Sequence, residues 1–106
     1  MAKYLWKANY VMEGLKGLIK EGGTSRRAVV EKMINSMGGK LEVFYYAFGD
    51  TDLYGIADMP DNVSTAAFTL IIAASGAVTL NTTVLMTPEE MDQAVKKIPS
   101  YRPPGR

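Results

Sequence analysis

The sequence predicts a single α+β domain with a ferredoxin-like β-α-β-β-α-β order, followed by one more helix at the C-terminus. Along the chain the spacing of the hydrophobic residues alternates, in that order, between the two-residue period of a strand and the 3.6-residue period of a helix. Glycine, proline and helix-capping residues separate the successive segments. The length of 106 residues, with 47% hydrophobic and 22% charged residues, is typical of one globular domain. We expect residues 1–98 to form this domain and residues 99–106 to form a Pro-rich, extended C-terminal tail.

The first half of the chain begins with a strand-like segment. Residues 3–10 place aromatic or small apolar side chains on one face in strict alternation, which predicts a β-strand. From Val11 the apolar residues recur at helical spacing until Gly22-Gly23 interrupts them. Thr24 or Ser25 is the expected N-cap of a second helical stretch, which ends at Gly38-Gly39.

The second half repeats the alternation of strand and helix. Residues 40–48 and 52–59 read as two strands joined by the polar turn 49–51. Residues 60–74 predict a helix that is apolar nearly all round, and such a helix is expected to be buried. Residues 77–86 are β-branched and alternating, so they predict the fourth strand.

The C-terminal segment has a strong helix-start signal. Thr87 is a capping residue, Pro88 suits the first helical position, and Glu90 completes a capping box. The tail from Ser100 onward contains prolines and one aromatic residue, Tyr101, which could anchor it. We expect this tail to lie against the body or against a neighbouring subunit.

The expected sheet is antiparallel, with the first and third strands in the centre and the helices covering one face. The strands at 40–48 and 52–59 carry large apolar residues on both of their faces. A solvated sheet face should instead be polar. We therefore expect the open face to be covered by a second copy of the chain, giving a homodimer or a larger oligomer of the dimeric α/β-barrel type.

The composition excludes several classes of chemistry. The chain has no cysteine and no histidine, which removes disulfides, thiolate or imidazole metal sites, and Ser-His-Asp catalysis. We expect no cofactor and no metal. A formal net charge of +1 favours neither nucleic acid nor a membrane surface as a partner. The N-terminal residues lack a secretory pattern, and no apolar run is long enough to span a bilayer, so the expected location is the cytoplasm.

Several stretches of the sequence resemble the bacterial GYD domain family. They are residues 3–10, residues 38–52, Met59-Pro60-Asp61 and residues 87–91. The resemblance covers about residues 3–98 and implies a ferredoxin-like fold and homo-oligomers, without implying a particular reaction. The family's namesake tripeptide falls in the turn that reads Gly49-Asp50-Thr51-Asp52 here. A threonine stands where the family has its tyrosine.

Topology predicts where a ligand-binding site would be. The end of the first strand, the 49–51 turn and the start of the fourth strand meet at one end of the expected sheet, which brings Thr79 toward the polar residues of the other two segments. The candidate ligand-binding residues gathered there are Lys7, Asn9, Tyr46, Asp50, Asp52 and Tyr54. Lys7 and Asp52 are the expected charged pair, and the tyrosines the expected walls. The alternative is that the aspartates are ordinary turn residues without a role in ligand binding.

Other interpretations stay open at this point. Residues 24–27 place two arginines near a helix N-terminus, which suits an anion, although a cap with solvated arginines explains them better. The leading function is an accessory protein that binds a small apolar molecule. The alternatives are a cofactor-free monooxygenase, isomerase or lyase acting on an apolar or aromatic compound, with Lys7, Tyr46, Asp52 or Tyr54 as its polar groups, and a purely structural assembly module.

Overall fold

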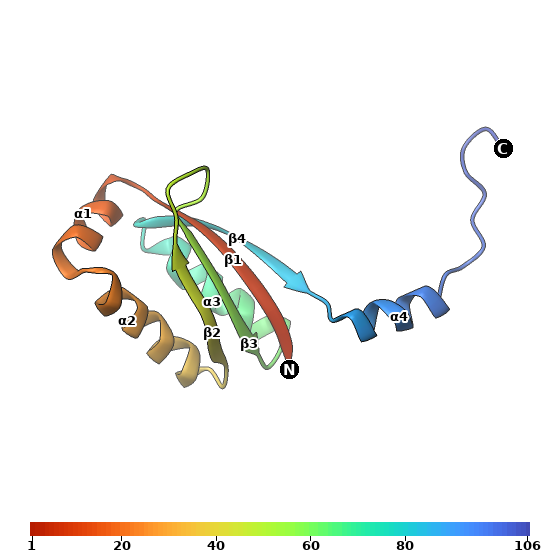
Figure 1. Cartoon of the computed structure of the whole chain (residues 1–106), viewed down its shortest axis with the longest axis horizontal. Helices are drawn as coiled ribbons and strands as arrows, with labels where there is room; N and C mark the ends of the chain where they lie inside the picture. The colour runs from red at the N-terminus through yellow and green to blue at the C-terminus, as the bar shows by residue number, and fades with distance from the viewer.

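A computed structural model describes residues 1–106 as an α+β fold with one four-stranded sheet and four helices (Figure 1). In chain order the elements are β1 (Ala2–Tyr10), α1 (Met12–Glu21), α2 (Gly23–Ser36), β2 (Lys40–Tyr46), β3 (Leu53–Met59), α3 (Asn62–Ala74), β4 (Val78–Leu85) and α4 (Pro88–Lys96). None of the helices has both the length and the hydropathy needed to cross a bilayer.

The sheet has the order β2-β3-β1-β4, and every neighbouring pair is antiparallel. This confirms the predicted ferredoxin-like arrangement, with β1 and β3 central. Lys3 near the start of the chain pairs with Asp58 of β3 on one side and with Leu85 of β4 on the other. The register between β2 and β3 shifts between Leu41 and Val43, where a β-bulge interrupts the alternation of β2.

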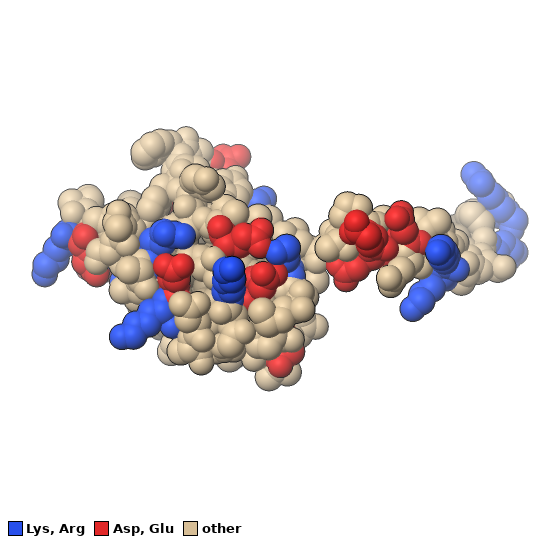
Figure 2. Space-filling view, turned by 60° about the horizontal axis from the view of Figure 1, so that its bottom comes forward, with Lys and Arg blue, Asp and Glu red and all other residues tan.

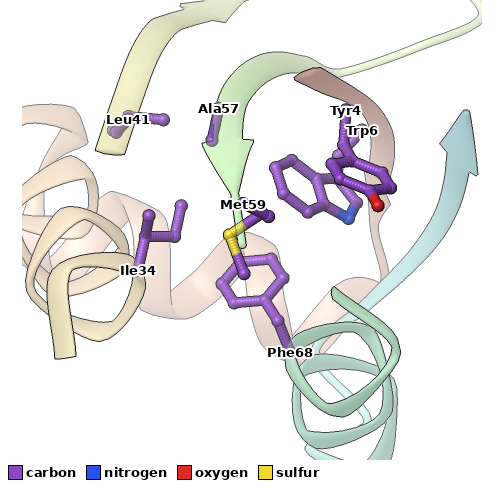
Figure 3. Close-up of a cluster of buried hydrophobic side chains, with 7 residues drawn as sticks. All are labelled: Tyr4, Trp6, Ile34, Leu41, Ala57, Met59 and Phe68. Atoms are coloured by element: carbon purple, nitrogen blue, oxygen red, sulfur yellow. The ribbon is translucent and has the colours of Figure 1, made fainter. Parts of the chain in front are cut away.

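The hydrophobic core lies between the sheet and the helices α2 and α3. Seven buried side chains form it (Figure 3): Tyr4, Trp6, Ile34, Leu41, Ala57, Met59 and Phe68. The rings of Trp6 and Phe68 lie 4.9 Å apart, and the indole N–H of Trp6 donates a hydrogen bond to Thr69 Oγ1 at 3.3 Å. Only 11 of the 106 residues are buried, so this core is small for the length of the chain.

Gly22 separates α1 from α2, as the glycine pair predicts. Its φ of 87° lies in the left-handed region that favours glycine, so it ends α1 and serves at once as the N-cap of α2. The prediction that Thr24 or Ser25 caps α2 is wrong, because this one-residue connection leaves no room for a separate cap. Both residues lie in the first turn of α2.

The predicted burial of α3 is wrong. Only Thr65 and Phe68 of this helix are buried, while Val63 and Leu70 expose 80% and 69% of their surface. One side of α3 packs on the sheet, and no other element of the same chain covers the opposite side (Figure 1). The N-terminus of the helix is well formed, because the Asp61 carboxylate accepts a hydrogen bond from the backbone N–H of Ser64 at 2.7 Å. This hydrogen bond lowers the pKa of Asp61.

The connection between β2 and β3 is longer than the predicted turn at 49–51. β2 ends at Tyr46 and β3 begins at Leu53. Between them, the backbone N–H of Ala47 donates a hydrogen bond to the carbonyl of Asp52 at 2.8 Å, which closes a loop of six residues.

The helix α4 projects away from the rest of the chain (Figure 1). The predicted capping box of Thr87 and Glu90 is present, with its two hydrogen bonds at 3.1 and 2.9 Å. No residue of α4 is buried. The tail beyond it also points away from the body, with Tyr101 exposed, so within one chain it does not lie against the body. Contact of the tail with a neighbouring subunit stays a prediction.

Candidate ligand-binding site

A cavity of about 550 Å³ lies on the face of the sheet that the helices cover. Its walls come from α1 and α2 on one side, from α3 on the other, and from β1 to β4 at its floor. Seventeen of its 24 lining residues are hydrophobic, among them Trp6, Val30, Phe44, Ile72 and Leu80. We call it the helix-face cavity. It adjoins the core and shares Trp6, Ile34, Leu41 and Phe68 with it.

Glycines in α1 and β3 help to create this space. Gly14 packs so closely on Ala77, the residue just before β4, that a Cβ atom there would lie 2.0 Å from the carbonyl oxygen of Ala77. Gly17 is one turn further along α1 and also lines the cavity, but nothing lies within 4 Å of its Cβ position. Gly55 forms part of the floor. The first glycine anchors α1 to the sheet, and the other two leave the volume unfilled.

Five polar residues lie among the apolar walls: Tyr10, Glu13, Glu21, Arg26 and Ser75. The guanidinium of Arg26 lies 3.6 Å from the carboxylate of Glu21 across the α1-α2 junction. Burial raises the pKa of the Tyr10 phenol to about 12, and the neighbouring Tyr46 hydroxyl adds to the increase. At neutral pH the phenol is therefore a neutral hydrogen-bond donor and acceptor beside an apolar space.

A smaller hollow of about 370 Å³ adjoins this cavity and shares Tyr10 and Leu18 with it. Tyr46, Phe48 and Asp52 line its other side. The hydroxyl of Tyr46 donates a hydrogen bond to the carbonyl of Gly23 at 3.0 Å, which ties the end of β2 to the start of α2.

The structure brings together part of the predicted site. The backbone N–H of Asp52 donates to the Asn9 Oδ1 atom at 2.9 Å, and the Asp52 carboxylate accepts from the N–H of Tyr10 at 2.9 Å. Asn9 pairs with Thr79 across the β1-β4 ladder. Asp50 lies exposed in the loop between β2 and β3. The end of β1, the loop before β3 and the start of β4 do meet at one end of the sheet.

Other members of the predicted site lie apart from each other. Lys7 and Tyr54 are cross-strand neighbours on the sheet face that bears no helix. Tyr46 lies on the opposite, helix-bearing face, where it contacts Gly23. The Asp52 carboxylate binds the backbone of Tyr10. The observed ion pairs are Lys3 with Glu42 and Asp58, Lys16 with Glu13, and Arg26 with Glu21, so no pair joins Lys7 to Asp52.

We call the helix-free side of the sheet the open face. Its side chains come from alternate positions of the four strands, and the larger ones are Lys3, Leu5, Lys7, Val43, Tyr45, Tyr54, Ile56 and Leu85. Lys3 lies between Glu42 and Asp58, and its hydrogen bonds to these carboxylates raise the pKa of its ammonium group. Over the body of the molecule in Figure 2, acidic and basic groups are intermixed, whereas acidic groups gather on the projecting helix α4.

The sequence interpretation missed the helix-face cavity and its polar residues Glu13 and Glu21. A signal was present, because the apolar stripe of α1 contains Gly14 and Gly17, one turn apart. Glycine is unfavourable in the middle of a helix, so two of them on a helix that packs against a sheet indicate either close packing or an unfilled space. Arg26, which was considered as an anion-binding residue, lines this cavity.

The family model described as GYD domain matches residues 4–95 of the chain. The chain belongs to the GYD domain family. The match runs from β1 to α4, so it includes the sheet and every wall of the helix-face cavity. No protein of curated function matches the sequence significantly.

In this GYD domain the namesake loop has a structural role that does not need the missing tyrosine. The aspartate of the motif corresponds to Asp52, which binds Asn9 and the backbone of Tyr10. Its own N–H also lies 3.1 Å from the carbonyl of Ala8. Thr51 occupies the tyrosine position and makes none of these bonds. The loop is therefore held against the end of β1 by its aspartate.

Proposed function

We propose that this GYD domain binds a small, largely apolar molecule in the helix-face cavity and acts without catalysing a reaction. The size and lining of the cavity carry this proposal. A volume of about 550 Å³ falls within the roughly 300–1,000 Å³ of typical ligand pockets, and such pockets combine apolar walls with a few polar groups. The hydroxyl of Tyr10 and the Arg26-Glu21 pair supply those polar groups.

The geometry favours binding over proton transfer. The Tyr10 phenol is protonated at neutral pH and burial raises its pKa further, to about 12, whereas a general base should titrate near neutral pH. The residues of the alternative enzyme hypothesis are divided between the two faces of the sheet. Lys7 and Tyr54 lie on the open face, whereas Tyr46 and Asp52 line the smaller hollow.

We also propose that the chain self-associates through its open face. Tyr45 and Tyr54 are cross-strand neighbours there, and Tyr45 exposes 70% of its surface. The pair Val43 and Ile56 lies next to them. The substitution Tyr45→Lys should lower the association constant measured by sedimentation, because it places a charge in the contact. Phe48→Lys, in the loop outside this face, should leave association unchanged.

Two measurements test the proposed ligand binding. A native mass spectrum of protein purified without denaturation should show a retained molecule, which would also reveal its chemical class. Titration with the apolar fluorescent probe 1-anilinonaphthalene-8-sulfonate should then report binding to the emptied cavity. Gly17→Phe should weaken probe binding, because the new ring occupies space that no other atom fills.

The matched control is Lys16→Phe, which adds the same ring to the exposed side of α1. It should leave probe binding unchanged. Equal probe binding by wild type, Gly17→Phe and Lys16→Phe would contradict the proposal. In that case, if Tyr45→Lys still lowers the association constant, the structural assembly module becomes the better interpretation.

A further inference from the structure

The helix α4 has an apolar side that nothing in its own chain covers. Met91, Val95 and Ile98 follow one another at i, i+4 and i+7, and each exposes more than half of its surface. A helix of nine residues is marginal in water without tertiary contacts. Apolar residues at this spacing are typical of a helix that docks into a surface of another protein. We therefore expect α4, although its N-terminus is well capped, to need a binding partner for its stability.

The outer side of α3 is a matching surface. Val63, Ala67, Leu70 and Ala74 lie at i, i+4, i+7 and i+11 along it, and all four are exposed. From Asn62 to Ala74 the helix has no charged residue. Small alanines between larger side chains let a second helix approach closely, in the manner of ridges packing into grooves.

The direction of α4 points to a second chain as the partner. Only Met86 and Thr87 separate it from β4, and α4 continues outward from the end of the sheet. α3 begins at this same end, because Leu85 pairs with Lys3 beside the start of β1. The radius of gyration is 17.1 Å, whereas a compact chain of this length has about 13 Å.

We propose that α4 of one chain docks on the outer side of α3 of a second copy, and that the exchange is reciprocal. A two-fold axis near Met86 and Thr87 satisfies both contacts at once, as closed symmetry requires. By helical spacing, the charged residues Glu89, Asp92 and Lys96 of α4 lie on its other side, and all three are exposed. No charge has to be buried on the α3 side, because that surface is uncharged.

The exposed area is large enough for such a contact. The chain exposes 7592 Å², whereas a compact monomer of 11.6 kDa exposes about 5,800 Å² by the usual scaling with mass. The excess of about 1,800 Å² exceeds the roughly 800 Å² per partner that a stable dimer buries.

Two substitutions test the exchange, both made in the Tyr45→Lys background so that the open face does not contribute. Val95→Glu charges the apolar side of α4, and Leu70→Glu charges the outer side of α3. Each should weaken self-association in sedimentation at least about tenfold, because a charge is buried without a partner. Gln93→Glu adds the same charge to the polar side of α4 and should have no effect. Fluorescence of the buried Trp6 checks that each variant is folded.

Mixing the two variants distinguishes exchange from docking within one chain. The Leu70→Glu chain keeps an intact α4, and the Val95→Glu chain keeps an intact α3. One productive contact can therefore form in the mixed dimer, so the mixture should associate more tightly than either variant alone. Unchanged association of both single variants would overturn the proposal, and so would a mixture that behaves like its separate components.

The test of the helix exchange is independent of the proposed ligand binding. Neither Val95 nor Leu70 lines the helix-face cavity, so probe binding should be the same in both variants. A failure of the exchange thus leaves the proposed ligand binding untouched, and the reverse also holds.

Discussion

Adjacent residues of β1 face different surroundings on the two sides of the sheet. Trp6 is 6% exposed and packs against Phe68, while Lys7 is exposed on the open face beside Tyr54. The helix face holds the core and the cavity. The open face combines ion pairs with tyrosines that have no partner in the chain. This difference indicates that the free energy of folding comes mainly from the helix-bearing face, and that the open face is available for association.

The largest expected effect contrasts these two neighbours. Trp6→Ala should lower the free energy of unfolding by about 3–5 kcal/mol, because it removes a buried ring and leaves a cavity in a small core. That is most of the stability of a marginal domain. Lys7→Ala should change it by less than about 0.5 kcal/mol. Urea unfolding monitored by circular dichroism measures both, and equal losses would refute the contrast between the faces.

A second contrast separates two glycines of α1. Gly14→Ala should destabilise the chain by about 1–3 kcal/mol, because the new methyl group collides with the backbone of Ala77. Gly17→Ala should stabilise it by about 0.5–1 kcal/mol, since alanine favours the helix and its methyl group meets nothing. Thermal unfolding of both variants tests this. If both glycines respond alike, then Gly14 does not pack against Ala77 as the structure shows.

A third contrast concerns the loop between β2 and β3. Asp52→Ala should cost about 1.5 kcal/mol, because it removes a charged acceptor from the N–H of Tyr10. Asp50→Ala should stay within about 0.5 kcal/mol, since this aspartate is an exposed loop residue. Chemical unfolding of both variants provides the measurement. A cost at Asp50 as large as that at Asp52 would assign the anchoring of the loop to the wrong carboxylate.

The smallest effect is a dependence on alkaline pH. The folded chain holds the Tyr10 proton more tightly than the unfolded chain, because burial raises its pKa from 10.0 to about 12. The resulting stability is complete below pH 10 and is lost as the pH rises toward 12. Because Tyr10 is only partly buried, the loss should be about 1 kcal/mol after solvent screening. Tyr10→Phe should lack this component when the two unfolding curves are compared between pH 9 and pH 12.

Much of the fold could be predicted because local signals and hydrophobic periods agree. The capping box at Thr87, the break at Gly22-Gly23 and the alternation of β1 all appear where the sequence places them. The exposure of the outer side of α3 within one chain could not be predicted. An apolar helix indicates that its sides are to be covered, but it does not identify which chain covers them.

The candidate site was only partly predictable, for a reason visible in β2. Tyr45 and Tyr46 are both aromatic, so the alternation does not reveal which of them faces the helices. The bulge between Leu41 and Val43 decides it, and it places Tyr46 on the helix face and Tyr45 on the open face. The proximity of Asn9 and Asp52 followed from topology alone, whereas their hydrogen bonds were not predicted. The cavity depends on how far α1 stands from α3, which no local pattern specifies.

The pairing of β1 with β4 has a consequence for the order of events during synthesis. β1 is the first strand to be made, yet it occupies the centre of the sheet and needs β4, one of the last elements, beside it. At about 5–20 residues per second, the roughly 80 residues between Lys3 and Leu85 take several seconds to emerge. Over that time a nascent chain carries Trp6 on a strand without its second neighbour. Such long-range pairing makes folding slow and leaves the growing chain dependent on protection from aggregation.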